Sequence, residues 1–217
     1  MASQSRRNPQ SDPLLTPENC LLVLIDYQAP QLNTLRSMDS LQLVANTVAL
    51  AETARLFDLP RILSTVGVES GVNPDTWPSI KNAMKGALNF DRTSINAWED
   101  ADFVSAVKAT GRRKIIMGAL WTEVCLAFPA LDALRDGFEV LVPVDVVGGT
   151  SVEAHQAGLD RAIQSGAQPV SWVSVLCELQ RDWNRENTAA GMLGIGSRQG
   201  GPWSSEIALK QFAAPGH

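Results

Sequence analysis

The sequence has few cysteines, few histidines and no long apolar run. Its three cysteines, Cys20, Cys125 and Cys177, form no CxxC pair and are too few for a disulfide framework. The two histidines, His155 and His217, belong to no HxxxH or DxH pattern, so we expect no metal. No window approaches the ~20 apolar residues that span a bilayer, so we expect a cytoplasmic protein with no membrane partner.

Basic stripes and phosphate-binding glycine motifs are also missing. The chain has 18 basic and 23 acidic residues, and no Lys/Arg stripe that would attract a phosphate backbone, so we expect no nucleic-acid partner. Neither the GxxxxGK[ST] P-loop nor a GxGxxG directly after a strand is present, so we expect no nucleotide cofactor. The G-x-S-x-G elbow of serine hydrolases is absent too.

Short apolar runs alternate with segments of helical periodicity. The expected strands are 20–25, 61–66, 114–120, 138–143 and 168–172, and the expected helices are 40–59, 101–110, 152–165, one from 122 and one ending near 183. Helices of this length between strands are typical of crossover connections between parallel strands. The pattern therefore predicts an α/β fold with a three-layer, doubly wound, Rossmann-like sheet.

The chain divides into one domain and two arms. Residues 1–14 are polar and carry two prolines, so we expect a flexible N-terminal arm. Residues 15–187 hold all the expected strands and form the single domain. Residues 188–217 are rich in glycine, which favours loop structure, yet they contain apolar side chains: Trp203, Ile207, Leu209 and Phe212. We therefore expect this C-terminal arm to pack in a homo-oligomer.

Asp26 and Cys125 lie where a doubly wound sheet places function, at the ends of its strands, and Arg92 lies in a polar segment between two expected elements. Asp26 ends the apolar run CLLVLI, and Cys125 follows the run KIIMGAL in the first turn of a helix, where unpaired N–H groups favour a thiolate. Arg92 lies in a segment too polar for a core strand. Taken singly, Cys125 is most simply a buried structural cysteine and Arg92 a solvated arginine. For Asp26, a carboxylate that faces a cleft or a cation is favoured over a helix cap or turn former, because nothing after it indicates the start of a helix.

Together these segments resemble the isochorismatase-like cysteine hydrolase superfamily, over about residues 18–185. The resemblance rests on LLVLIDYQ with Asp26, on GALWTEVCLAFPALDAL with Cys125, and on RTSINAW with Arg92. It implies a sheet of about six parallel strands and an Asp, Lys, Cys triad, with Arg92 where the family has lysine. The ending WVSVLCELQRDW is similar to a branch of poorly characterised hydrolases without bound metal.

The resemblance also implies a mechanism. Asp26 takes the thiol proton of Cys125, and the thiolate attacks the carbonyl carbon of a small amide or related compound to form a thioester-type intermediate. A cis peptide bond between Leu120 and Trp121 is implied, so that the N–H groups of Trp121 and Cys125 both donate to the oxyanion. Arg92 acts only through its charge, because a guanidinium does not release its proton. A tetramer or octamer is implied as well.

Two other functions stay open beside C–N bond hydrolysis. One is vinyl-ether hydrolysis of an isochorismate-type substrate, which needs no thiol, so Cys125 argues against it. The other is a non-catalytic or redox-responsive oligomeric scaffold that retains the fold.

The neighbouring residues give further expectations. We expect Arg92 to hold the pKa of Cys125 below the usual ~8.5. Cys20, in a strand, and Cys177, in the apolar stripe of a late helix, are expected to be buried and unreactive. His155 is most simply a helix-packing residue.

Overall fold

The centre of the molecule is a parallel β-sheet. The computed structural model describes residues 7–199 and 201–212. Its strands are β1 (Cys20–Ile25), β2 (Arg61–Val66), β3 (Leu88–Arg92), β4 (Lys114–Ala119), β5 (Glu139–Pro143) and β6 (Gln168–Val170). The six strands lie in the order β3-β2-β1-β4-β5-β6, and all neighbours are parallel. This confirms the predicted doubly wound sheet.

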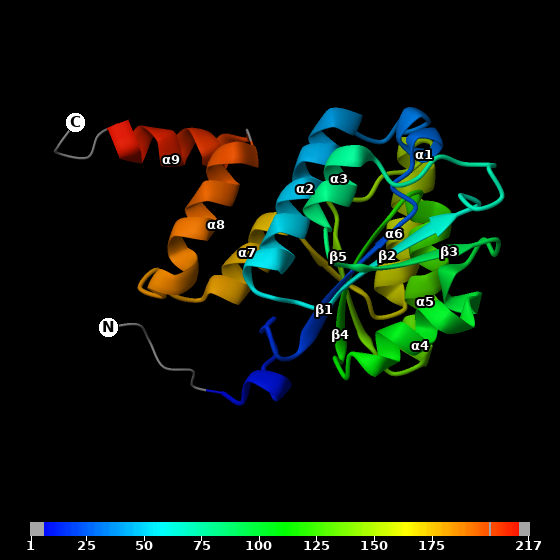
Figure 1. Ribbon diagram of the computed structural model, residues 1–217, viewed down its shortest axis with the longest axis horizontal. Helices are drawn as coiled ribbons and strands as arrows, with labels where there is room; N and C mark the ends of the chain where they lie inside the picture. Colours follow the sequence, from blue (N-terminus) through cyan, green and yellow to red (C-terminus); the bar gives the residue numbers. More distant parts are fainter. Residues whose placement is uncertain (1–6, 200, 213–217) are drawn as a thin grey trace.

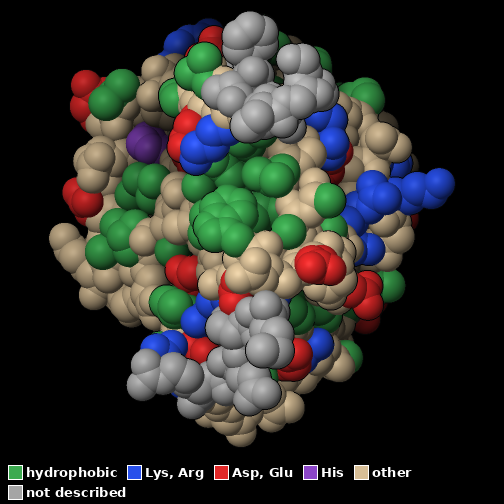
Figure 2. Space-filling view, turned by 90° about the vertical axis from the view of Figure 1, so that its left-hand side faces the viewer, with side chains coloured by type: hydrophobic (Ala, Val, Ile, Leu, Met, Phe, Trp, Pro, Cys, Tyr) green, Lys and Arg blue, Asp and Glu red, His purple; other side chains and the backbone are tan. Residues whose placement is uncertain are grey.

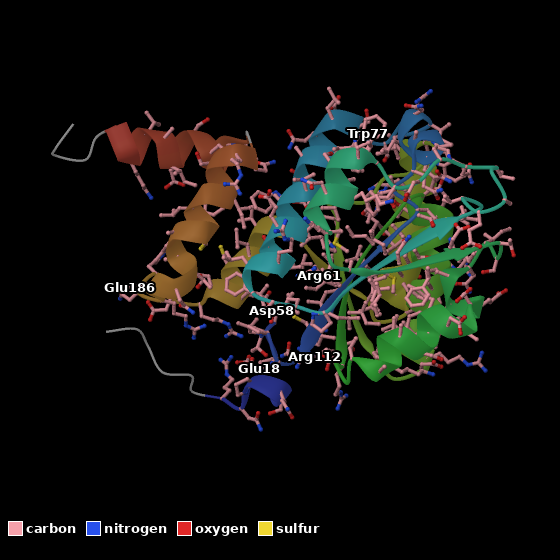
Figure 3. All side chains as sticks on the ribbon, viewed as in Figure 1. Glu18, Asp58, Arg61, Trp77, Arg112 and Glu186 are labelled. Atoms are coloured by element: carbon pink, nitrogen blue, oxygen red, sulfur yellow. The ribbon has the colours of Figure 1, made fainter. Side chains whose placement is uncertain are left out.

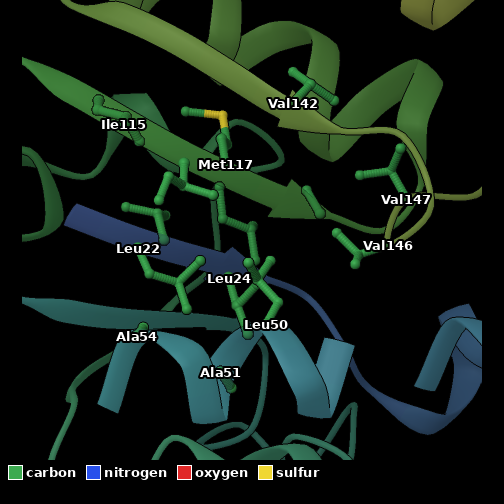
Figure 4. Packing of buried hydrophobic residues seen from close by; sticks show 14 of the residues in the cluster. Leu22, Leu24, Leu50, Ala51, Ala54, Ile115, Met117, Val142, Val146 and Val147 are labelled. Atoms are coloured by element: carbon green, nitrogen blue, oxygen red, sulfur yellow. The ribbon is translucent and has the colours of Figure 1, made fainter. Parts of the chain in front are cut away.

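Helices cover both faces of this sheet (Figure 1). On one face lie α2 (Ser40–Leu56), α3 (Pro78–Ala83) and α7 (Trp172–Gln180), and on the other α4 (Ala101–Ala109), α5 (Ala127–Arg135) and α6 (Val152–Gln164). Every residue of β1 and β4 is buried, because helices cover these two central strands from both sides. Figure 4 shows Leu22 and Leu24 of β1 beside Met117 of β4 and Leu50 of α2.

The two ends of the sheet can be followed in Figure 3. Glu18 and Arg112 lie where β1 and β4 begin, and the guanidinium of Arg112 donates to the Glu18 carbonyl. Trp77 lies toward the opposite end, where its N–H donates to the carbonyl of Tyr27 at 2.7 Å. The residues that follow β1 and β4 therefore meet at the same end of the sheet.

Two elements beside the site were not expected. The strand β3 includes Phe90, Asp91 and Arg92, in a segment that is too polar for a core strand. It forms because β3 is an edge strand, where polar and exposed residues are tolerated. A short helix, α1 (Ala29–Asn33), follows Asp26 although nothing there indicated a helix; Gln28 precedes it and Pro30 lies in its first turn.

The described part of each terminal arm lies against the domain. Asp12 is buried and pairs with Arg7 and Arg181, and Lys114 donates to the Pro13 carbonyl. Residues 7–14 are thus tied to the domain, where a flexible arm was expected.

Three glycines of the C-terminal segment, Gly191, Gly194 and Gly196, lie in a helix, so the loop predicted from them is wrong. α8 (Glu186–Gln199) packs on α2, and α9 (Pro202–Phe212) packs on α8. The ring of Trp203 lies so close to Gly196 that a Cβ there would be 2.5 Å from it. Glycine is therefore required by close approach of the two helices and not by a turn. None of the helices in the described ranges is long and apolar enough to cross a membrane.

A tight contact beside the site gives a test of this packing. The Tyr27 hydroxyl donates to the Val146 carbonyl at 2.7 Å, and a Cβ added at Gly118 would lie 2.5 Å from that hydroxyl and 2.9 Å from Leu24. We predict that Gly118→Ala lowers the free energy of unfolding by about 1–3 kcal/mol, because overpacking displaces Tyr27. Urea denaturation measures this.

Gly194→Ala is the matched control for Gly118→Ala. The nearest atom to its new Cβ is the flexible end of Arg198, at 3.2 Å, and alanine favours a helix over glycine. We expect no destabilisation there. Wild-type stability in Gly118→Ala would contradict the packing described at Tyr27.

Candidate active site

Asp26 lies directly after β1, in a backbone conformation that is rare for its residue type. Its φ is 60°, in the left-handed region, and its N–H donates to the Ser64 carbonyl of β2 at 2.9 Å. Residues other than glycine persist in this region only where the surrounding structure holds them. The side chain is fully buried. The end of β1 therefore fixes a carboxylate inside the protein.

Arg92, the last residue of β3, forms a bidentate ion pair with Asp26. Its Nη1 and Nη2 each lie 2.8 Å from one carboxylate oxygen, and they also donate to the carbonyls of Thr65 at 3.0 Å and Ile95 at 3.1 Å. Burial opposes the charge of Arg92, but the hydrogen bonds and charge of Asp26 outweigh burial, so its pKa is raised. The pair is anchored to backbone on both sides of the guanidinium.

Cys125 lies beside this pair, on a π-helical turn, η3 (Thr122–Leu126), that follows β4. Because Ile25 pairs with Ala119, the segments after β1 and β4 start side by side. Cys125 is 8% exposed, and both the Asp26 carboxylate and the Trp121 N–H lie close enough to its sulfur to shift the pKa of the thiol. The peptide bond between Leu120 and Trp121 is cis.

The expectation of a low pKa for Cys125 is wrong. Burial raises its pKa, and the charge of Asp26 and the hydrogen bond to it raise it further; the charge of Arg92 and the Trp121 N–H only partly offset this. The sequence indicated that Cys125 lies at the start of a helix, which lowers a thiol pKa, but it did not indicate that Cys125 is buried next to the Asp26 carboxylate, which raises it. At rest a neutral thiol faces a carboxylate, which is the starting arrangement for proton transfer from sulfur to Asp26.

The structure places Asp26, Arg92, Cys125 and the N–H of Trp121 at one end of the sheet, close to one another. His155 lies on α6, and its Nδ1 is 2.8 Å from the Thr122 hydroxyl. His217 lies outside the described residues. Within the described ranges, no group of three or more His, Cys, Asp or Glu side chains could hold a metal ion.

The other two thiols differ from each other. Cys20 is buried, and burial raises its pKa to about 12. Cys177 is exposed, which corrects the expectation that it is buried: it lies on a face of α7 that the helices around it leave open. A helical periodicity identifies the apolar stripe but does not settle which residue at its border is covered.

Gln28 is a further residue of the site, and its role was missed. Its fully buried amide accepts from the Val66 N–H at 3.1 Å and donates to the carbonyls of Val66 at 3.2 Å and Pro74 at 2.7 Å. It thereby holds the end of β2 between the strands that carry Asp26 and Arg92. Its place in LLVLIDYQ was part of the motif, but contacts 38 or more residues away leave no local signal.

Comparisons with known proteins agree with this geometry. The Isochorismatase domain model matches residues 20–174. Over 173 residues the chain is 39% identical to "Probable hydrolase YcaC" of Escherichia coli (strain K12), covering 79% of this chain and 83% of that protein. It is 26% identical over 174 residues to "Isochorismatase domain-containing protein 2" of Danio rerio, covering 80% and 85%.

Two solved structures are similar over nearly the whole chain. One is YcaC from Pseudomonas aeruginosa with hexane-2,5-diol and covalent acrylamide, at TM-score 0.85 and 35% identity, covering 94% of this chain and 99% of that one. The other is the YcaC gene product of Escherichia coli, described as an octameric hydrolase of unknown specificity, at TM-score 0.86 and 35% identity, covering 94% and 98%.

The environments of the three thiols predict an order of alkylation. Exposed Cys177 should react with iodoacetamide first, Cys125 next, and Cys20 only when the protein is unfolded. Because the pKa of Cys125 is raised, its thiolate fraction, and so its alkylation rate, should still be rising above pH ~9.5, where a free cysteine with a pKa of ~8.5 has almost levelled off. Mass spectrometry of the three cysteine peptides over a pH series measures both. Labelling of Cys20 at the rate of Cys177 in the folded protein would contradict the burial described here.

Proposed function

The chain belongs to the isochorismatase domain family and is a hydrolase of that family, and we propose that it cleaves a small amide or related carbonyl compound through a thioester on Cys125. One observation carries the proposal: the buried Asp26 carboxylate is held by two hydrogen bonds from Arg92 and lies close enough to Cys125 to raise the pKa of its thiol. A nucleophile, its base and a third group that orients the base are the parts that covalent catalysis of acyl transfer requires.

In the first half of the reaction Asp26 takes the proton from Cys125 Sγ while the sulfur attacks the carbonyl carbon. The carbonyl oxygen becomes negative and accepts from the N–H groups of Trp121 and Cys125. The C–N bond then breaks, the leaving nitrogen takes the proton from Asp26, and the acyl group stays on sulfur. The Trp121 N–H acts to lower the pKa of the Cys125 thiol, which supports the placement of this donor beside the sulfur.

In the second half water attacks the thioester. Asp26 takes a proton from the water, the new C–O bond forms, and the C–S bond breaks. Asp26 then passes the proton that it took from water to the thiolate of Cys125, and the carboxylic acid product leaves. Arg92 orients Asp26 through two hydrogen bonds and balances the negative charge, but it moves no proton, because its pKa is raised above an already high value.

The covalent acrylamide of the Pseudomonas aeruginosa relative supports a reactive nucleophile in this fold. Acrylamide is an electrophilic alkene, and thiolates add to it readily. In this chain the thiol beside a base is that of Cys125, so we propose Cys125 as the position that an electrophile would modify in the site.

We predict that Cys125→Ala lowers turnover by about 10³-fold or more, because the covalent step is lost. The probes are p-nitrophenyl acetate and a panel of small primary amides, followed by nitrophenolate and ammonia release. Mass spectrometry of the wild-type Cys125 peptide should show the added acetyl group. Cys177→Ala removes the exposed thiol and should keep full activity.

Undiminished turnover in Cys125→Ala would contradict the nucleophilic role. Turnover of an isochorismate-type vinyl ether by that variant would favour the thiol-free reaction instead. An inactive wild type whose Cys125 takes up no acyl group from any probe would favour the non-catalytic scaffold.

We also propose that the chain forms a homo-oligomer, as the octameric relative does. Figure 2 shows apolar side chains gathered on the face where α8 and α9 lie. Trp183, between α7 and α8, is 61% exposed, and Leu209 of α9 is 68% exposed. Of the other side chains expected at a neighbour, Trp203 packs on Trp172 and Ile207 is buried within the chain; the side chain of Phe212 lies outside the described residues.

Light scattering coupled to size exclusion should therefore give a mass several times 23.4 kDa at micromolar concentration. Trp183→Ser should weaken the assembly, because it removes exposed apolar surface at the interface. Val72→Ser, at a residue 76% exposed in the loop after β2, is the matched control and should leave the mass unchanged. A monomer in the wild type would overturn the proposal.

A further inference from the structure

The turn that carries Cys125 is tied to the segment that follows β5. The Thr122 N–H donates to the Gly148 carbonyl at 3.0 Å, and the Thr122 hydroxyl lies 2.8 Å from Nδ1 of His155 on α6. The next residue, Glu123, accepts through Oε1 from the N–H of Thr150 at 3.0 Å and from its hydroxyl at 2.7 Å. Both residues therefore attach η3 to the loop before α6 and to α6 itself.

α6 also touches the backbone of this turn directly. A Cβ added at Gly158 of α6 would lie 2.7 Å from Cα and 2.8 Å from N of Glu123. The backbones of α6 and η3 are thus so close at Gly158 that no larger residue fits there. Gly158 lies about one helical turn after His155. The imidazole is held at the Thr122 hydroxyl by main-chain packing and not by a flexible surface contact.

The direction of the hydrogen bond between Thr122 and His155 depends on which ring nitrogen carries the proton. Thr122 is fully buried, and a buried hydroxyl without a partner is destabilising. Burial lowers the pKa of His155, while the charge of Glu123, on the facing turn, opposes this. The imidazole is therefore neutral at neutral pH, with one nitrogen free to accept. In the tautomer with the proton on Nε2, the Thr122 hydroxyl donates to Nδ1.

We propose that His155 is a positioning residue for Cys125: by accepting from the Thr122 hydroxyl, it fixes the turn that presents the sulfur and the Trp121 N–H to Asp26. The proposal rests on the proposed function of Cys125. His155 acts through Thr122 and not on the reacting atoms. When the acceptor is lost, the turn keeps its backbone tie to Gly148 but loses its buried side-chain tie, and the sulfur and donor are no longer held in register with the base.

The test measures the rate constant for acetylation of Cys125 by p-nitrophenyl acetate in two pairs of variants. His155→Leu and Thr122→Val each remove one partner and should lower the rate constant about tenfold, the value of one buried hydrogen bond. His155→Asn keeps an acceptor near the place of Nδ1, and Thr122→Ser keeps the hydroxyl, so both should stay within about threefold of wild type. The double variant His155→Leu/Thr122→Val should lose no more than either single one.

Gln156→Ala is the matched control, since Gln156 is the neighbouring residue on α6 and its amide bonds only to Asp160 of the same helix among the contacts described. It should acetylate like wild type. If His155→Leu or Thr122→Val does not fold, the acetylation rates of His155→Asn and Thr122→Ser and the ¹⁵N spectrum of His155 still test the positioning role. With two histidines in the chain, a ¹⁵N spectrum resolves His155 once His217→Gln removes the other signal.

Wild-type His155 should appear as the neutral form protonated at Nε2. Protonation at Nδ1, or wild-type acetylation rates in both His155→Leu and Thr122→Val, would overturn the positioning role while leaving Cys125 as nucleophile. Failure of wild-type Cys125 to acetylate at all would instead overturn the proposed function, and the positioning role with it.

Discussion

The buried ion pair between Asp26 and Arg92 is the constraint on which the arrangement of the site depends. Two charges removed from water are tolerated only with close geometry and further hydrogen bonds, and an unpaired one would be strongly destabilising. Here the geometry comes from three strands: β1 supplies the carboxylate, β3 the guanidinium, and β2, which lies between them, the Thr65 carbonyl that Arg92 also binds. The pair therefore locks the ends of these strands together, and the edge strand β3 is required for it.

The same pair sets the chemistry available to Cys125. Burial and Asp26 raise the thiol pKa, so a free thiolate does not accumulate. In the mechanism that we propose, the nucleophile therefore forms when Asp26 takes the proton during attack. Arginine in place of the family's lysine fits this division of work. The guanidinium holds both carboxylate oxygens at once and keeps its own protons, so in the proposed mechanism the carboxylate alone acts as the base.

Local sequence patterns predicted the central elements well, because apolar runs of strand length report burial on both faces. The bounds of β1 and β2 are as predicted, and the motifs around Asp26 and Cys125 located both residues at strand ends. The predictions that failed depend on contacts between distant segments. β3 is an edge strand, so it lacks an apolar signature, and the thiol pKa is set by burial beside Asp26, which is 99 positions away. The contact of His155 with Thr122, 33 residues earlier, likewise leaves no local pattern.

The division of roles between Asp26 and Arg92 is tested most directly by single-turnover acetylation of Cys125 in Asp26→Asn and Arg92→Lys. If Asp26 is the base and Arg92 only orients it, the amide should slow acetylation by about 10² to 10⁴-fold, the usual contribution of a general base. Lysine keeps the charge and one hydrogen bond, so Arg92→Lys should stay within about tenfold of wild type. Acetylation at the wild-type rate in Asp26→Asn, or a larger loss in Arg92→Lys than in Asp26→Asn, would contradict this assignment.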